Sequence, residues 1–460
     1  MSAAITDPDS LAADARAART QLLLTGPVGA TLARLAAPNI LAMLVSAAMN
    51  ISEAAFAGMI GVSALAGIAL VYPLVMLVQM LSAGSMGGAI SSAVSRALGA
   101  GEAARAGRLV VAAWVIAGTI ALAFAVVLLL FGAPMFSALS GGGEAGQQAL
   151  SYAMIYFPGC IAVWLTHSTL SVIRGCGNMA MPSLLLTGAS IATIPLSGAL
   201  ALGWGPFPAL GLAGLSLGQI SVFAVTALIA VFYVASGRAG LRVSGIGLGL
   251  RHFADILRVG AASSLNALQT VITIVAITAI VGQFGEAALA GYGLGARLEF
   301  IMVPVVFGVG AAMTAMVGAN MGAGNRDRAL RIGWTGSVAA GAIVGGVGLF
   351  FALFPDLWLG LFLEPDNVAA LAAGRSYFRT VAPFYALFAL GLALYFASQG
   401  AGRVFWPILG GGARMIVAIG GALVLTSAGF GLGGAFVAIA GGMAAYGLVT
   451  AVGIALTRWR

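Results

Sequence analysis

Gly61-Val-Ser-Ala-Leu-Ala-Gly67 returns 224 residues later as Gly285-Glu-Ala-Ala-Leu-Ala-Gly291. Further blocks repeat in the same order at nearly the same offset: Gly99-Ala-Gly101 with Gly322-Ala-Gly324, Ser151-Tyr152 with Ser376-Tyr377, and Gly211-Leu-Ala-Gly214 with Gly431-Leu-Gly-Gly434. One such match means little in a chain so rich in glycine and alanine, but four matches in one order indicate an internal duplication. The chain is therefore predicted to consist of two similar halves.

The composition is typical of a membrane protein. Hydrophobic residues make up 61% of the 460 residues, charged residues make up 7%, and the mean hydropathy is +1.07. A bilayer core about 30 Å thick needs roughly 20 apolar residues per helix. The apolar runs are continuous and rich in small residues, which indicates helices rather than barrel strands. Twelve spans are predicted, near residues 36–60, 63–95, 108–132, 149–173, 181–202, 210–236, 257–282, 288–319, 331–354, 377–399, 408–428 and 433–456.

Twelve spans over two halves place six helices in each half. Because six is even, both halves keep the same orientation in the membrane. The predicted fold is an all-α polytopic membrane protein whose two six-helix lobes are related by a pseudo-twofold axis along the membrane normal. The predicted parts are an N-terminal tail (1–30), a first lobe (31–236), a linker (237–256) and a second lobe (257–460).

The positive charge is interpreted as a topology signal. All 21 basic residues are arginines, and they are scattered between apolar spans instead of forming a nucleic-acid-binding patch. With the N-terminus inside, 17 of them fall on the cytoplasmic side, as the positive-inside rule requires. We therefore expect a multi-pass protein of the bacterial plasma (inner) membrane, with both termini and the linker in the cytoplasm. His252, in the linker, is expected to be solvated.

Two glycine-rich stretches resemble a known family. Gly293-Leu-Gly-Ala-Arg-Leu-Glu299 leads to Val317-Gly-Ala-Asn-Met-Gly-Ala-Gly324, and Arg174-Gly-Cys-Gly177 is followed by Pro182. Over about residues 30–455 the chain resembles the multidrug and toxic compound extrusion (MATE) family. That resemblance implies twelve helices, two lobes and export driven by an inward H⁺ or Na⁺ gradient.

Within that family the chain is expected to lie closer to the DinF-like branch than to the NorM-like branch. The NorM-like branch has acidic residues in its seventh and tenth helices, where this chain has Gln269 or Thr270 and Phe388. The chain also departs from the DinF-like branch, because its fifth span lacks the carboxylate that this branch often carries. Fewer charged ligands for Na⁺, which prefers several oxygen atoms, favour H⁺ as the coupling ion.

Glu53 is the candidate ion-coupling residue. It lies inside the first span, where members of the family often have an aspartate, and burying a carboxylate in hydrocarbon costs about 2.5–3.5 kcal/mol. We expect it to face the interior of the lobe and to bind a proton or a cation. The alternative is a structural carboxylate that neighbouring helices satisfy.

Candidate cavity and substrate residues are Met49, Asn50, Tyr72, Ser190, Thr193, Ser197 and Gln269. Met43, Phe56, Met76 and Met80 could line the same apolar cavity, because methionine and aromatic side chains suit adaptable binding surfaces. The alternatives are ordinary packing for the apolar residues and hydrogen bonds between helices for the fifth-span hydroxyls.

Arg297, Glu299, Arg414 and His167 are predicted to have structural or secondary roles. Arg297 and Glu299 lie too close in sequence to face each other on one helix, so Glu299 is expected to pair with Arg414 in a structural network. The alternative is a direct role of these residues in substrate binding. Most membrane histidines serve as hydrogen-bonding interface residues, and His167 could alternatively relay protons.

No catalytic constellation, metal site or nucleotide-binding loop is apparent in the sequence, so an enzyme is not expected. We expect a monomeric antiporter, without a cofactor other than its coupling ion, that exports small cationic or amphipathic organic compounds. Its partners would be those substrates and the lipid bilayer, with no nucleic acid. The alternative is a flippase for a lipid-linked oligosaccharide or a similar lipid intermediate.

Overall fold

The computed structural model describes residues 8–459, and all regular structure in that range is helical. The elements of the first half are α1 (Pro8–Thr25), α2 (Val28–Ile60), α3 (Val62–Gln79), η1 (Met80–Met86), α4 (Gly87–Gly99), α5 (Ala103–Ser140), α6 (Glu144–Gly175), α7 (Ala180–Leu202) and α8 (Leu212–Ala235). Those of the second half are α9 (Leu250–Gly282), α10 (Glu286–Gly322), α11 (Arg326–Leu353), α12 (Pro355–Leu359), α13 (Val368–Val381), η2 (Ala382–Phe384), α14 (Tyr385–Ala401), α15 (Phe405–Met415), η3 (Ile416–Gly420), α16 (Gly421–Leu425), η4 (Thr426–Phe430) and α17 (Gly431–Thr457).

The helices cross a membrane twelve times. The described residues contain eleven continuous helical runs that are long and apolar enough to span, and the last run covers residues 405–457. This run folds back on itself at Gly429 and Gly431, whose φ angles of 89° and 55° favour glycine. As a result α17 packs along α15 and α16, and the run makes two crossings. The predicted all-α, twelve-helix fold is confirmed.

Two hydrophobic cores define two lobes, and one helix of each half contributes to both. The first core is built from residues of α2 to α8, but it also contains Ile256 and Val259 from the start of α9. The second core is built from residues of α9 to α17, but it also contains Leu32 and Ala36 from the start of α2. The first membrane-spanning helix of each half, α2 or α9, therefore contacts both lobes, in agreement with the symmetry that the repeat predicts.

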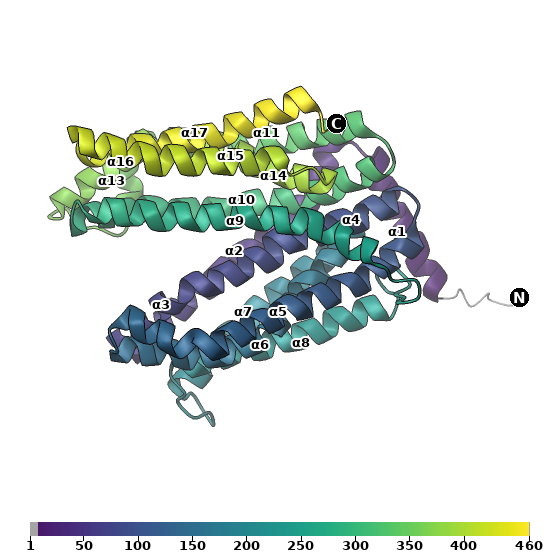
Figure 1. Cartoon of the computed structure of the whole chain (residues 1–460), viewed down its shortest axis with the longest axis horizontal. Helices are drawn as coiled ribbons and strands as arrows, with labels where there is room; N and C mark the ends of the chain where they lie inside the picture. Colours follow the sequence, from purple (N-terminus) through teal and green to yellow (C-terminus); the bar gives the residue numbers. More distant parts are fainter. Residues whose placement is uncertain (1–7, 460) are drawn as a thin grey trace, which may run out of the picture.

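The lobes touch at one end of the bundle and diverge toward the other (Figure 1). Both ends of the described chain lie at the closed end, called here the terminal end; the opposite end is called the far end. At the terminal end α4 and α10 meet backbone to backbone: a Cβ added to Gly322 would lie 2.0 Å from the carbonyl oxygen of Arg96. Ser92 Oγ donates a hydrogen bond of 3.0 Å to the carbonyl of Gly400. Small residues thus permit direct contact between the lobes.

The segment predicted as an N-terminal tail contains helix α1, which packs against α10 at the terminal end. Arg16 donates a 2.6 Å hydrogen bond to the carbonyl of Gly240 in the linker. Asn320 Nδ2 donates a 3.0 Å hydrogen bond to the carbonyl of Leu23, whose side chain joins the second core. The segment therefore connects the linker with the second lobe.

The prediction that His252 is a solvated loop residue is wrong. Helix α9 begins at Leu250, so the end of the predicted linker is helical and His252 lies in its first turn. The side chain is fully buried, and its Nε2 accepts a 3.1 Å hydrogen bond from Arg108 Nε of α5. The ring is buried because it caps α9 and attaches it to the first lobe.

Candidate functional site

Glu53 lies in a buried polar centre of the first lobe. Its side chain is 7% exposed, and its Oε1 has no hydrogen-bond partner among the described residues. Tyr72 of α3 and Tyr152 and Tyr156 of α6 are its electrostatic neighbours. Tyr152 Oη donates a 3.0 Å hydrogen bond to Gln219 Oε1, whereas the hydroxyl of Tyr156 has no partner in the described part of the chain. An unpaired carboxylate oxygen and an unpaired hydroxyl in one buried region can together bind a proton or a small cation.

The other predicted first-lobe residues lie on α2, α3 and α7. Met49 is buried and Asn50 is half-buried, one turn before Glu53, and Tyr72 is exposed.

The three hydroxyls of α7 already have hydrogen bonds inside the lobe. Ser190 Oγ lies 3.0 Å from Ser46 Oγ, Thr193 bonds to its own helix, and Ser197 Oγ donates to the carbonyl of Leu215 at 3.1 Å. These bonds join α7 to α2 and α8, and none of the three residues lines the main cavity.

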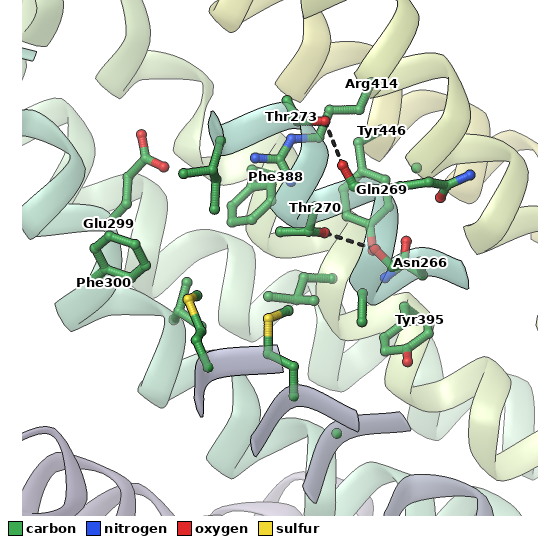
Figure 2. A pocket seen from close by; sticks show the side chains of 18 of the residues that line it. Asn266, Gln269, Thr270, Thr273, Glu299, Phe300, Phe388, Tyr395, Arg414 and Tyr446 are labelled. Atoms are coloured by element: carbon green, nitrogen blue, oxygen red, sulfur yellow. Dashed lines mark hydrogen bonds between the residues drawn. The ribbon is translucent and has the colours of Figure 1, made fainter. Parts of the chain in front are cut away.

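The main cavity lies mostly in the second lobe. Figure 2 shows that α9, α10, α14, α15 and α17 contribute its side chains. Gln269, predicted as a cavity residue, lies in it, and so do Met76 and Met80 from the first half. Sequence reasoning missed Asn266, Thr273 and Tyr446. The stripe Asn266, Gln269, Thr270, Thr273 at helical spacing in α9 was the signal that could have revealed the α9 residues.

A glycine allows the amide side chains of α9 to approach α15. A Cβ added to Gly411 would lie 2.5 Å from Gln269 Oε1 and 2.6 Å from Asn266 Oδ1. The hydroxyls of Thr270 and Thr273 donate to the backbone carbonyls of Asn266 and Gln269, at 2.9 Å and 2.7 Å (Figure 2). Their own helix thus satisfies the threonines, and the amides face the cavity.

The predicted pair between Glu299 and Arg414 is not formed, because no ion pair among the described residues joins them. Glu299 instead accepts a hydrogen bond from the hydroxyl of Tyr377 in α13. Arg414 lies over the ring of Phe388, with 4.7 Å between Cζ and the ring centroid. Arg297 lies over Phe362 at 5.7 Å and does not line the cavity. The cavity therefore has a carboxylate and a guanidinium as separate charged groups.

His167 bonds inside the first lobe. Its Nδ1 lies 2.8 Å from Ser82 Oγ of η1, and its ring meets Phe223 edge to face at 5.9 Å. The side chain thereby connects α6 with η1 and α8. In residues 8–459 no group of three or more histidine, cysteine, aspartate or glutamate side chains could hold a metal ion.

Twelve apolar crossings in two lobes, a buried carboxyl group and a largely apolar cavity define a multi-pass membrane transporter. The MatE family model matches residues 38–198 and again residues 262–424. The chain belongs to this family of MATE transporters, which are not enzymes. The two matches begin 224 residues apart, which confirms the duplication predicted from the glycine blocks.

Two curated relatives illustrate the range of names in the family. The chain is 23% identical to the FAD transporter of Shewanella oneidensis over 313 residues, which cover 67% of this chain and 68% of that protein. It is 27% identical to the probable multidrug resistance protein NorM of Deinococcus radiodurans over 432 residues, 91% of this chain and 93% of that one.

A solved structure shows the same fold. It is a MOP superfamily transporter from Pyrococcus furiosus, for which a reversed polarity of the binding pocket is said to suggest a different function. The TM-score is 0.86 at 22% identity, and the match covers 95% of this chain and 97% of that one.

Proposed function

We propose that this transporter exports small amphipathic organic compounds in exchange for protons and that Glu53 is the proton-coupling residue. The observation that supports the proposal is the buried Glu53 carboxyl group with an unpaired oxygen, which has Tyr156, whose hydroxyl is also unpaired, as an electrostatic neighbour. An ionisable residue inside a membrane span is expensive and is by default a functional-site hypothesis.

Protons suit this centre better than Na⁺. Hard cations prefer several oxygen ligands, and carboxylates are the strongest of these in proteins. Glu53 is the one acidic residue of the described first-lobe spans that is buried, and its neighbours are tyrosines. A single carboxyl group that can be neutralised by protonation needs no further ligands, which supports H⁺ coupling.

The main cavity supports an organic substrate. Phe300, Phe307 and Phe388 line it together with two methionines, and a few polar groups are spaced among them. Such a surface binds flat apolar compounds and can adapt to several of them. The Glu299 carboxylate would favour compounds with a positive group, as expected from the sequence. Relatives named as multidrug resistance proteins and as an FAD transporter are consistent with organic substrates.

The lipid flippase is the weaker candidate. A strongly basic cavity would suit the phosphates of a lipid-linked intermediate, but Arg414 is the single basic residue among the described residues that line the main cavity. Export of water-soluble compounds fits this surface better.

We also propose that the terminal end faces the cytoplasm of a bacterium, since the predicted cytoplasmic arginines support that orientation. In that orientation the lobes diverge toward the outside. Two predictions from the sequence stay predictions: that the protein is a monomer, and that it lies closer to the DinF-like branch of the family.

Purified protein in vesicles tests the proposal. The vesicles are loaded with ethidium or riboflavin, and a pH gradient or an Na⁺ gradient is imposed separately. We expect the pH gradient alone to accelerate efflux. Efflux driven only by Na⁺ contradicts proton coupling, and movement of a fluorescent lipid between leaflets, without efflux of either compound, favours the flippase.

Gly411→Ala should weaken binding of both compounds to the cavity by about tenfold, because the new methyl group pushes Gln269 and Asn266 away from α15. Equilibrium binding to protein in nanodiscs measures the change. Gly420→Ala is the matched control, since a Cβ there meets nothing within 4 Å. Equal affinities in the two variants would show that the amides do not shape the cavity.

A further inference from the structure

Arg414 is a positive charge inside a membrane span that forms no ion pair, although the Glu299 carboxylate is an electrostatic neighbour. Its side chain is half-buried and lines the main cavity. Within the described part of the chain, no carboxylate lies at ion-pair distance from it and no hydrogen bond to its guanidinium is formed. The ring of Phe388 lies against the charge, with 4.7 Å between Cζ and the ring centroid. An unpaired intramembrane arginine that faces a cavity indicates a site that an anion completes.

The carboxylate in the same cavity does not fill this role. Glu299 lies in the same cavity but not at ion-pair distance from Arg414, and it accepts a hydrogen bond from Tyr377. The hydroxyl of Tyr385 is also within its reach. Tyrosine hydroxyls thus donate hydrogen bonds to the Glu299 carboxylate. The guanidinium N–H groups of Arg414 make no hydrogen bond within the described part of the chain, so a ligand can use them.

The surroundings of Arg414 suit an oxyanion. Cζ of Arg414 lies 4.7 Å from the centroid of the Phe388 ring, a contact that uses none of the guanidinium N–H groups as hydrogen-bond donors to oxygen. Such N–H groups can bind carboxylate or phosphate with two hydrogen bonds. The side-chain amides of Asn266 and Gln269 reach α15 one turn before Arg414, with their oxygens nearest Gly411 and Gln269 Nε2 nearest Gly412. Their NH₂ groups can donate further hydrogen bonds to a ligand in the cavity. Phe300 and Phe307 supply the apolar remainder of the cavity.

We propose that Arg414, together with the amides of Asn266 and Gln269, binds an oxyanion group of an aromatic substrate. The site would take the carboxylate or phosphate of a flat compound whose rings lie among the phenylalanines and methionines. This inference rests on the proposed function, because it names the substrate class of the same cavity. It adds a negative group to the small amphipathic compounds named there.

Paired probes that differ only in the anion test this proposal. Flavin mononucleotide is compared with riboflavin for phosphate, and 7-hydroxycoumarin-3-carboxylic acid with 7-hydroxycoumarin for carboxylate. Binding to the full chain in nanodiscs is measured at equilibrium without any ion gradient. Wild-type protein should bind the anionic member of a pair at least about tenfold more tightly, as for a charge-assisted bidentate contact.

Arg414→Gln should remove most of that preference and leave the affinity for the uncharged member nearly unchanged. Arg297→Gln is the matched control, because Arg297 lies in the same lobe outside the cavity, and it should keep the preference. A preference in one pair only supports the site and identifies its anion. The proposal is overturned if wild type binds both members of both pairs equally, or if the preference survives Arg414→Gln. Equal binding of both members by wild type overturns the proposal even if Arg414→Gln does not fold, and Arg414→Lys, which lacks the two parallel N–H donors, then replaces that variant and should lose most of the preference.

The binding experiment tests the oxyanion site, and the efflux experiment tests proton coupling, so either proposal can fail without the other. Binding without a gradient does not depend on Glu53, so a protein that prefers the anions but shows no proton-driven efflux retains this site and loses the proposed coupling. Proton-driven efflux without any anion preference gives the reverse conclusion.

Discussion

Glu53→Gln reduces efflux driven by a pH gradient to the level of protein-free vesicles. Glutamine keeps the size and polarity of the side chain but can neither bind nor release a proton. A proton gradient can bias the two access states only through a group whose protonation differs between them. Glu53 is buried with an unpaired oxygen, so its substitution removes that group and leaves the second-lobe cavity intact. Efflux of ethidium or riboflavin from vesicles measures the effect.

Equilibrium binding of the same compounds separates coupling from substrate recognition. Glu53→Gln should change their affinities by less than about threefold, because Glu53 does not line the main cavity. Glu144→Gln is the matched control, an exposed acid in the same lobe whose loss should leave efflux intact. Normal proton-driven efflux by Glu53→Gln would rule out the proposed role.

Gly322→Val prevents the lobes from closing at the terminal end and stops transport. A Cβ at this position would lie 2.0 Å from the backbone carbonyl oxygen of Arg96, and backbone cannot move aside as a flexible side chain can. The clash disfavours only the state in which α4 and α10 touch, so the population should shift toward a state open at the terminal end. Because alternating access needs both states, efflux should fall to background.

Distances between spin labels at the far end measure this shift. Exposed Val62 of α3 and Val368 of α13 are replaced by cysteines in a chain in which both buried native cysteines, Cys160 and Cys176, are alanine. Gly322→Val should shorten the distance between the labels. Gly293→Val, in the same helix with nothing within 4 Å of its Cβ, should not. Unchanged distances together with normal efflux would show that the contact at Gly322 does not control access.

The membrane spans and the duplication, which were predicted from residue patterns along the chain, were confirmed. A bilayer demands about 20 apolar residues per helix, so the spans could be recognised from the sequence. The repeated glycine blocks revealed the duplication, since either close contact between helices or a positive φ angle restricts those positions to glycine in both halves. At Gly322 the structure shows this contact directly.

Side-chain partners far apart in the sequence were decided by tertiary structure. His252 was expected in solvent because its sequence neighbours resemble a loop. Its side chain is nevertheless buried, and it accepts a hydrogen bond from Arg108, 144 residues away. Glu299 was expected to pair with Arg414, but Tyr377 lies closer to it. Two opposite charges in a membrane suggest an ion pair. The packing of α13 and α14 instead brings the hydroxyls of Tyr377 and Tyr385 within hydrogen-bond distance of the carboxylate.

The sequence by itself therefore determined the twelve-helix, two-lobe membrane fold and the family, because hydropathy and glycine spacing are local properties of the chain. It also identified Glu53 as an acidic residue that is costly to bury. Only the tertiary structure decided where the cavity lies and which groups meet in it. Five helices of the second lobe, together with residues of α3 and η1 from the first lobe, line the cavity. Arg414 forms no ion pair there, because Phe388 rather than a carboxylate packs against it.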